Sequence, residues 1–147
     1  MYGIVPSIEK YTLSHLYELI RDEEMRETKF VFVHCGGPYV KETGFINNTY
    51  PNVCGDLSEM IVFISFGVTS KLLDVFEMAP TSKIMHGSDG WNIPELFWTS
   101  SLLARKSLYS VFSELLSSGT IDDEVWAFNS TRAVLSDNSK KLHRLGG

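Results

Sequence analysis

Four ionisable side chains, His34, Asp56, Glu59 and Asp89, come at or just after the ends of three short apolar stretches of the sequence. Neutral imidazoles and carboxylates are both ligands that divalent metals accept in proteins. A carboxylate can also take a proton from a water molecule that a metal activates. If the three stretches are parallel strands, their carboxyl ends meet at one rim and these side chains converge there. The pattern therefore suggests metal-assisted chemistry.

Each of these residues also has a purely structural interpretation. An Asp between Ser and Gly is common as a turn residue or helix N-cap, and a His after an apolar strand often only satisfies local hydrogen bonds. Asp56 can equally orient a neighbouring group, and a solvated loop position is the favoured interpretation of Glu59. The convergence of the group is what favours a site, with His34 and Asp89 as its candidate metal ligands and catalytic residues.

Neighbouring residues are candidates for a substrate pocket. Gly36 and Gly37 leave open space beside His34, which suits a substrate or a tight turn equally well. Trp91 is a further pocket candidate, together with the aromatic residues that begin the next predicted helix. Packing of these rings over the mouth of the site is the simpler expectation.

Three other potential ligands are expected to take no part in this site. His86 precedes Asp89 by three residues, so the pleat of a strand puts the two on opposite faces, and we expect His86 to face the helical layer. Cys35 and Cys54 lie on different predicted elements and lack the spacing of a zinc site. A disulfide between them is open, but two reduced thiols are favoured.

The spacing of apolar residues predicts alternating helices and strands. Strands are predicted over 29–33, 53–57 and 83–87, and helices over 11–27, 39–49, 58–79, 94–116, 122–135 and 139–145. This alternation implies an α/β fold with parallel strands and right-handed crossovers. It fits either an open doubly wound sheet or part of a (β/α)8 barrel. Doubly wound sheets that bind nucleotides usually carry a GxGxxG or Walker-type loop, and the absence of such a loop here argues against a nucleotide-binding sheet of that kind.

Composition excludes several classes of protein. The chain has 147 residues, a formal net charge of −5, 44% hydrophobic and 21% charged residues, which is typical of one globular domain with a real core. The mildly acidic net charge argues against a nucleic-acid-binding protein, which usually carries a basic patch. No apolar run approaches the roughly 20 residues of a membrane helix. The N-terminal segment lacks the pattern of a signal peptide. We therefore expect a cytoplasmic protein with no nucleic-acid or membrane partner.

Two segments resemble a known family. VFVHCGGPYVKETGFINNTYPNVCGDLSE and KIMHGSDGWNIPELFW resemble the amidohydrolase-related metal-dependent hydrolases of the TIM-barrel type. The resemblance is to the branch whose barrel occurs alone or fused to a glutamine synthetase domain, the fluG and nodulin type. There, a His ends strand six, YPNV begins strand seven and SDG…IPE follows strand eight. The segment TRAVLSDNSKKLHRL is similar to the family's closing helix. The resemblance implies that residues 1–147 are a C-terminal portion of a partial TIM barrel, about strands six to eight with their helices.

This resemblance also implies roles for the site residues. His34 corresponds to the strand-six histidine, a metal ligand or water-orienting residue. Asp89 corresponds to the strand-eight aspartate, which binds the metal and takes a proton from the hydrolytic water. The implied cofactor is Zn²⁺ or another divalent metal. The family's His-x-His pair and strand-five histidine have no counterpart in this sequence, and a catalytic zinc usually needs three protein ligands. Weak or absent metal binding is therefore expected of this chain alone.

Two functions remain open at this point. The chain is the C-terminal part of a hydrolase that acts on a C–N or ester bond of a small molecule, or assists a decarboxylation. Alternatively, it is a catalytically incompetent half-barrel that serves assembly, beside a glutamine synthetase domain or through self-association of exposed barrel faces. Whether the chain alone is an enzyme is left open. A small doubly wound binding domain is a third interpretation, which predicts a phosphate site at a helix N-terminus.

Overall fold

The computed structural model describes residues 7–145, and the N-terminal residues 1–6, on which part of the signal-peptide prediction rests, lie outside the described residues. Within that range the strands β1 (Phe30–Phe32), β2 (Val53–Asp56) and β3 (Ile84–Met85) form one parallel sheet in the order β1-β2-β3. Phe30 pairs with Val53, and Gly55 pairs with Ile84. The fold is α/β and mostly helical, and each strand lies inside its predicted range.

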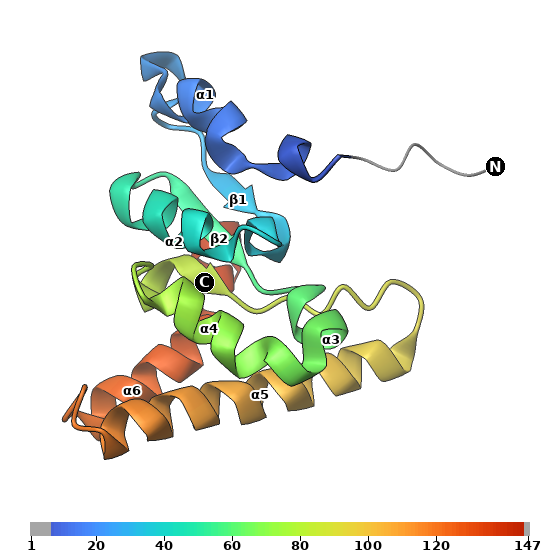
Figure 1. Cartoon of the computed structure of the whole chain (residues 1–147), viewed down its shortest axis with the longest axis vertical. Helices are drawn as coiled ribbons and strands as arrows, with labels where there is room; N and C mark the ends of the chain where they lie inside the picture. The colour runs from blue at the N-terminus through green and yellow to red at the C-terminus, as the bar shows by residue number, and fades with distance from the viewer. Residues whose placement is uncertain (1–6, 146–147) are drawn as a thin grey trace.

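Helices connect the strands and pack side by side. Their bounds are α2 (Val40–Thr49), α3 (Met60–Ile64), α4 (Val68–Phe76), α5 (Pro94–Ser117), α6 (Glu124–Arg132) and α7 (Asn138–His143). Helix α2 packs on α4, α4 on α5, and α5 on α6, and Figure 1 shows this series stacked from α2 down to α5 and α6. Helix α2 joins β1 to β2, and α3 and α4 join β2 to β3, so both connections between parallel strands are helical crossovers.

Short irregular turns lie between these helices. They are η4 (Val33–Gly36) after β1, η5 (Ser65–Gly67) between α3 and α4, η6 (Thr81–Lys83) before β3, and the π-helical turn η7 (Ala133–Asp137) between α6 and α7. The predicted helix over 58–79 is therefore two helices. The predicted pair over 122–135 and 139–145 is one nearly continuous helical segment, because η7 bridges α6 and α7.

The N-terminal segment departs most from prediction. Apolar spacing predicts one helix over 11–27, whereas the structure has a short helix between 3-10 turns: η1 (Ile8–Tyr11), η2 (Leu13–Leu16), α1 (Tyr17–Arg21) and η3 (Glu23–Met25). Thr12 is extended and its hydroxyl accepts the N–H of Ser14, while the carboxylate of Asp22 accepts the N–H of Glu24. Such side-chain bonds to the backbone compete with helical hydrogen bonds, and here they interrupt the helix on both sides.

Two apolar cores hold the strand ends in place. The larger lies between the sheet and the helices α3 to α6, and its fully buried members include Leu57, Ile61, Leu72, Val75, Ile84, Leu108 and Val111. The smaller lies under the N-terminal segment and comprises Leu13, Ile20, Phe32, Ile46 and Val53. Each fully buried aliphatic side chain contributes about 1.5–3 kcal/mol. The loops that follow the strands therefore start from fixed positions.

The two outer strands of the sheet differ at their outer edges. The outer edge of β3 is covered by the C-terminal helical segment, because the N–H of His86 donates to the carbonyl of Val134 and the side-chain amide of Asn138 donates to the carbonyl of Ile84, each at 2.8 Å. No further strand pairs with β1 or β3 in the described part of the chain. Proteins normally pair, cover or twist away such edges, because unpaired backbone groups invite association. No helix between residues 7 and 145 has the length and apolar character needed to cross a bilayer.

Candidate metal centre

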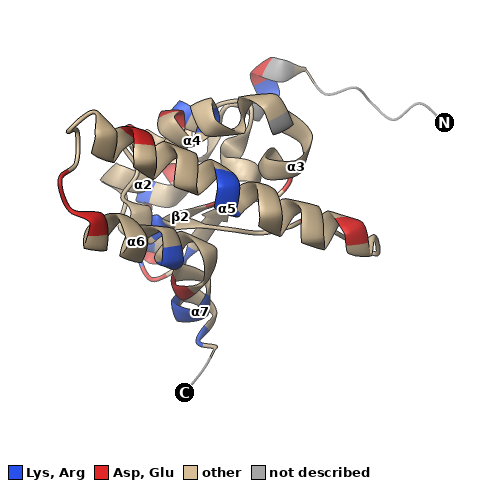
Figure 2. Ribbon diagram, turned by 90° about the horizontal axis from the view of Figure 1, so that it is seen from below, with Lys and Arg blue, Asp and Glu red and all other residues tan. Residues whose placement is uncertain are grey.

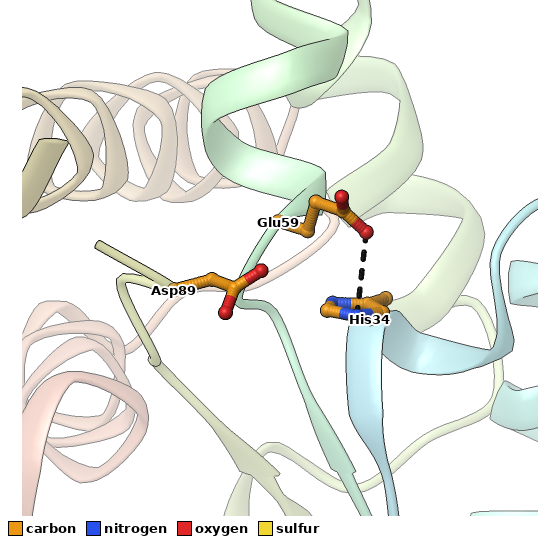
Figure 3. A group of neighbouring side chains, drawn as sticks. All are labelled: His34, Glu59 and Asp89. Atoms are coloured by element: carbon orange, nitrogen blue, oxygen red, sulfur yellow. Dashed lines mark ion pairs between the residues drawn. The ribbon is translucent and has the colours of Figure 1, made fainter. Parts of the chain in front are cut away.

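His34, Glu59 and Asp89 lie together beyond the carboxyl ends of the strands (Figure 3). His34 belongs to the turn η4 after β1, Glu59 directly precedes α3, and Asp89 lies in the loop between β3 and α5. One ligand atom of each residue lies within 4.8 Å of those of the other two, and all three side chains are partly exposed. The structure thus places His34 and Asp89 on one rim, as the strand pattern predicts, and adds Glu59.

Left-handed backbone conformations position both loop residues. The φ angles are 59° at His34, 48° at Cys35 and 48° at Asp89. Non-glycine residues rarely adopt positive φ, which costs roughly 1–2 kcal/mol, and they do so where surrounding contacts impose it. Cys35 is fully buried, and its carbonyl accepts the hydroxyl of Thr43 at 2.6 Å. This anchored turn directs the imidazole of His34 toward the rim.

The two ring nitrogens of His34 have different partners. Nε2 lies 3.3 Å from Oε2 of Glu59, and Nδ1 lies 3.1 Å from the hydroxyl oxygen of Ser58. Ser58 is itself held, because its backbone N–H donates to Oδ1 of Asp56 at 2.7 Å. An outer partner on one ring nitrogen is the usual way in which proteins orient a histidine that binds a metal through the other.

The donor set fits a divalent cation. Ligands about 2.1 Å from zinc lie roughly 3.4 Å apart at the tetrahedral angle, and the 3.3 Å between His34 and Glu59 matches that separation. A carboxylate oxygen of Asp89 lies within 4.8 Å of the ligand atoms of both, so it is the third donor of the group. One imidazole and two carboxylates form a mixed nitrogen and oxygen set, which suits zinc, manganese or iron better than a soft metal.

An apolar recess of about 340 Å³ opens beside His34 and Glu59. The other residues that line it are Gly37, Pro38, Met60, Phe63 and Ile64. Gly37 is therefore the predicted pocket residue that the recess includes. Gly36 instead packs closely against α2 and the N-terminal segment, where a Cβ would lie 2.5 Å from the hydroxyl oxygen of Thr43. Trp91 is 84% exposed and is not part of this lining.

Burial takes two further potential ligands out of the site. Burial, with a smaller contribution from Asp56, raises the pKa of the Cys35 thiol, which therefore stays protonated. Burial also lowers the pKa of His86; Asp56 opposes this change and Arg105 adds to it. The backbone N–H of His86 donates to the carbonyl of Val134 at 2.8 Å, so this residue packs against the final helical segment. Neither cysteine forms a disulfide.

Known proteins offer two informative similarities. No family model matches the chain. Over 133 residues it is 31% identical to the protein fluG of Emericella nidulans, a match that covers 90% of this chain and 15% of fluG. Its fold is similar to the crystal structure of a candidate metal-dependent hydrolase from Lactobacillus casei ATCC 334, with a TM-score of 0.75 and 20% identity over 88% of this chain and 33% of that one. The chain therefore spans a small part of fluG and about a third of the Lactobacillus protein.

Glu59 is the member of the group whose role the sequence pattern leaves most open. A solvated loop position is its favoured interpretation from the sequence, and its side chain is 47% exposed, while its Oε2 lies 3.3 Å from Nε2 of His34. The available signal is its place in the chain, since it follows a strand at the same rim as His34 and Asp89. The chain thus offers three donors, one more than the two candidate ligands that the sequence predicts.

Proposed function

We propose that this chain forms the part of an amidohydrolase-type (β/α)8 barrel that corresponds to strands six to eight, and that it supplies a metal-binding rim to a hydrolase. The convergence of His34, Glu59 and Asp89 beyond three parallel strands is the observation that carries the proposal. Enzymes with this barrel place their active sites at that end. The similarities to fluG and to the Lactobacillus protein support the same assignment. Further barrel strands would pair with the outer edge of β1, whereas the outer edge of β3 is bonded to η7 and α7.

The proposed chemistry divides between the cation and the chain. A bound divalent cation supplies Lewis acidity, which polarises a carbonyl group and lowers the pKa of a water molecule. His34, Glu59 and Asp89 would hold the cation, with the imidazole kept in orientation by Ser58. The carboxylate of Asp89 would also be the group placed to accept a proton from a water molecule at the rim. The reaction classes that fit are hydrolysis of a C–N or ester bond and an assisted decarboxylation.

Two features of the rim bear on its substrate and on its affinity for metal. The apolar recess beside His34 and Glu59 suits the nonpolar part of a small molecule. The sequence contains neither the family's His-x-His pair nor its strand-five histidine. The three donors are also partly exposed. We therefore expect this chain to bind zinc or another divalent ion more weakly than a complete catalytic site does.

Assembly is a second candidate function, which rests on exposed aromatic side chains near the rim. The most exposed are Phe63 at 69%, Phe66 at 106%, Trp91 at 84% and Trp98 at 69%. Large exposed apolar groups that lie together often mark protein interfaces. A module of this kind would cover them with a second copy of the chain or with a glutamine synthetase domain, and it would not require the metal.

Metal titration of the purified chain tests the first proposal. Isothermal titration with Zn²⁺ or Co²⁺ should show one ion per chain. The substitutions Asp89→Ala and Glu59→Gln should each weaken binding by about tenfold or more, because each removes a ligand. Glu114→Gln is the matched control, since Glu114 is an exposed carboxylate on α5, and this variant should bind as the wild type does. Hydrolysis of a p-nitrophenyl ester should require the metal and decline in the two site variants.

Two results would contradict this assignment. Equal metal affinity in the wild type and in all three variants would show that Asp89 and Glu59 do not hold the ion. A chain that binds no metal, and whose mass by light scattering is unchanged in Asp89→Ala, would favour the assembly module instead.

A further inference from the structure

A second cavity, of about 390 Å³ and lined by four cationic side chains, lies at the opposite end of the sheet from the metal group. Lys29 directly precedes β1, Lys83 directly precedes β3, and Cys54 belongs to β2. Lys141 and Arg144 complete the charged lining from the C-terminal helix α7 and its cap. The cavity therefore opens at the amino ends of the strands, whereas His34, Glu59 and Asp89 follow the carboxyl ends.

Positive charge gathers in this cavity although the chain as a whole is acidic. Four of its 13 lysines and arginines line the cavity, and none of its 18 aspartates and glutamates does. Figure 2 shows basic residues along α7, which ends beside this cavity. Among residues 7–145, no ion pair joins any of the four cations to a carboxylate. Of the described residues, no carboxylate lines the cavity beside these cations, so the cavity favours anions.

Lys83 is fixed in position within the cavity. Its Nζ donates to the carbonyls of Asn47 at 2.6 Å and Tyr50 at 2.8 Å, at the end of α2. A lysine ammonium has three N–H donors, so one remains for a ligand. Burial lowers the pKa of Lys83, and Lys29 adds to this effect. Burial raises the pKa of Cys54, and both lysines oppose that change, so the two ammonium groups and the thiol face the same space.

We propose that this cavity binds the phosphate group of a small phosphorylated molecule. A phosphate dianion accepts several charge-assisted hydrogen bonds at once, and lysine and arginine are its common partners. Ser82 adds a hydroxyl donor to the lining. The volume exceeds that of one phosphate group and falls within the range of small-molecule pockets, about 300–1,000 Å³. The ligand is therefore a phosphate ester with a small organic part, and the site does not depend on the metal centre.

Titration of the full chain at low ionic strength tests this site. Glycerol 3-phosphate and inorganic phosphate are the probes, with acetate as the carboxylate comparison. Lys141→Gln and Arg144→Gln should each weaken binding of glycerol 3-phosphate by about tenfold, because each removes a charged hydrogen-bond donor. Lys140→Gln is the matched control, since Lys140 is exposed on the same helix but does not line the cavity. It should change the affinity by less than about twofold, and Asp89→Ala should leave it unchanged.

The Cys54 thiol provides a second measurement inside the cavity. Cys54 is partly exposed, whereas Cys35 is fully buried, so iodoacetamide should modify Cys54 first. Saturating glycerol 3-phosphate should slow this modification. The proposal is overturned if no phosphate compound binds, if acetate binds as tightly, or if Lys140→Gln weakens binding as much as Lys141→Gln. It is also overturned if saturation leaves the modification rate of Cys54 unchanged. Tighter binding of inorganic phosphate than of the ester would overturn the choice of an ester.

Discussion

The Nε2 atom of His34 lies 3.3 Å from Oε2 of Glu59, and the two residues come from loops that follow neighbouring strands of the sheet. Ser58 holds the other side of the imidazole ring, with its hydroxyl oxygen 3.1 Å from Nδ1. Ser58 is nearly buried and its backbone is tied to Asp56. The histidine is therefore oriented by the fold itself, which is what a preorganised metal site requires.

The Ser58 hydroxyl should influence metal binding without touching the metal. Ser58→Ala removes the partner of Nδ1, so the imidazole of His34 loses its fixed orientation. Loss of such an outer partner typically weakens metal binding by about 10–100-fold, and we expect a loss in that range. Titration with Co²⁺, followed by its visible absorption, measures this directly.

Ser70→Ala is the control for this prediction. Ser70 is an exposed residue of α4 whose hydroxyl donates to the carbonyl of Gly67 at 2.9 Å, so the substitution removes the same hydroxyl group at a residue that belongs neither to the metal group nor to the lining of the recess. Its metal affinity should equal that of the wild type. If Ser58→Ala also binds with unchanged affinity, Ser58 does not orient His34.

The order of strands and helices follows from the sequence because each strand is a short apolar stretch bounded by turn residues. The interruption of the N-terminal helix does not follow, because side-chain bonds to the backbone at Thr12 and Asp22 compete with the helix and the first of these residues also has a partner that is distant in the sequence. The carboxylate of Glu42 in α2 accepts hydrogen bonds from the Thr12 hydroxyl at 3.2 Å and from the N–H of Leu13 at 3.1 Å. A local apolar pattern contains no information about that contact.

The candidate site also has one part that the sequence predicts and another that it does not. That His34 and Asp89 share a rim follows from parallel strand order, which fixes where strand ends meet. That Glu59 joins them depends on the rotamer of a half-exposed side chain, which no periodicity determines. The positive φ angles at His34 and Asp89 also decide where both side chains point. Histidine and aspartate are enriched among non-glycine residues with positive φ, but few of them adopt it, so residue type alone does not predict the conformation.

Burial of His86 should make the protein less stable in mild acid. The unfolded chain binds a proton at this residue near pH 6.5, whereas burial lowers the pKa of His86 in the folded protein. Below about pH 6.5 the unfolded state therefore binds more protons, and stability falls as the pH falls, by at most about 1.4 kcal/mol per pH unit from this group. Urea unfolding at several pH values between about 7.5 and 5 measures the slope.

The substitution His86→Gln identifies the group responsible. It removes the titrating ring, so the free energy of unfolding should depend less on pH in this range than it does in the wild type. His143→Gln, at an exposed position of α7, should retain the wild-type slope. A slope that persists in full in His86→Gln would assign the acid sensitivity to other residues.

Gly44 sits where α2 meets α4, two helices that lie against each other in Figure 1. In an isolated helix, replacing glycine by alanine stabilises by roughly 0.5–1 kcal/mol. Here a Cβ on Gly44 would lie 2.9 Å from the carbonyl oxygen of Val75, a backbone atom that cannot turn aside. We therefore expect Gly44→Ala to lower the free energy of unfolding by about 1–3 kcal/mol, as overpacking does elsewhere.

Asn48→Ala, at an exposed position of the same helix, should change the free energy of unfolding by less than about 0.5 kcal/mol. Urea unfolding of both variants separates the two effects, because a Gly44→Ala protein more stable than the wild type would mean that α2 and α4 do not pack this closely.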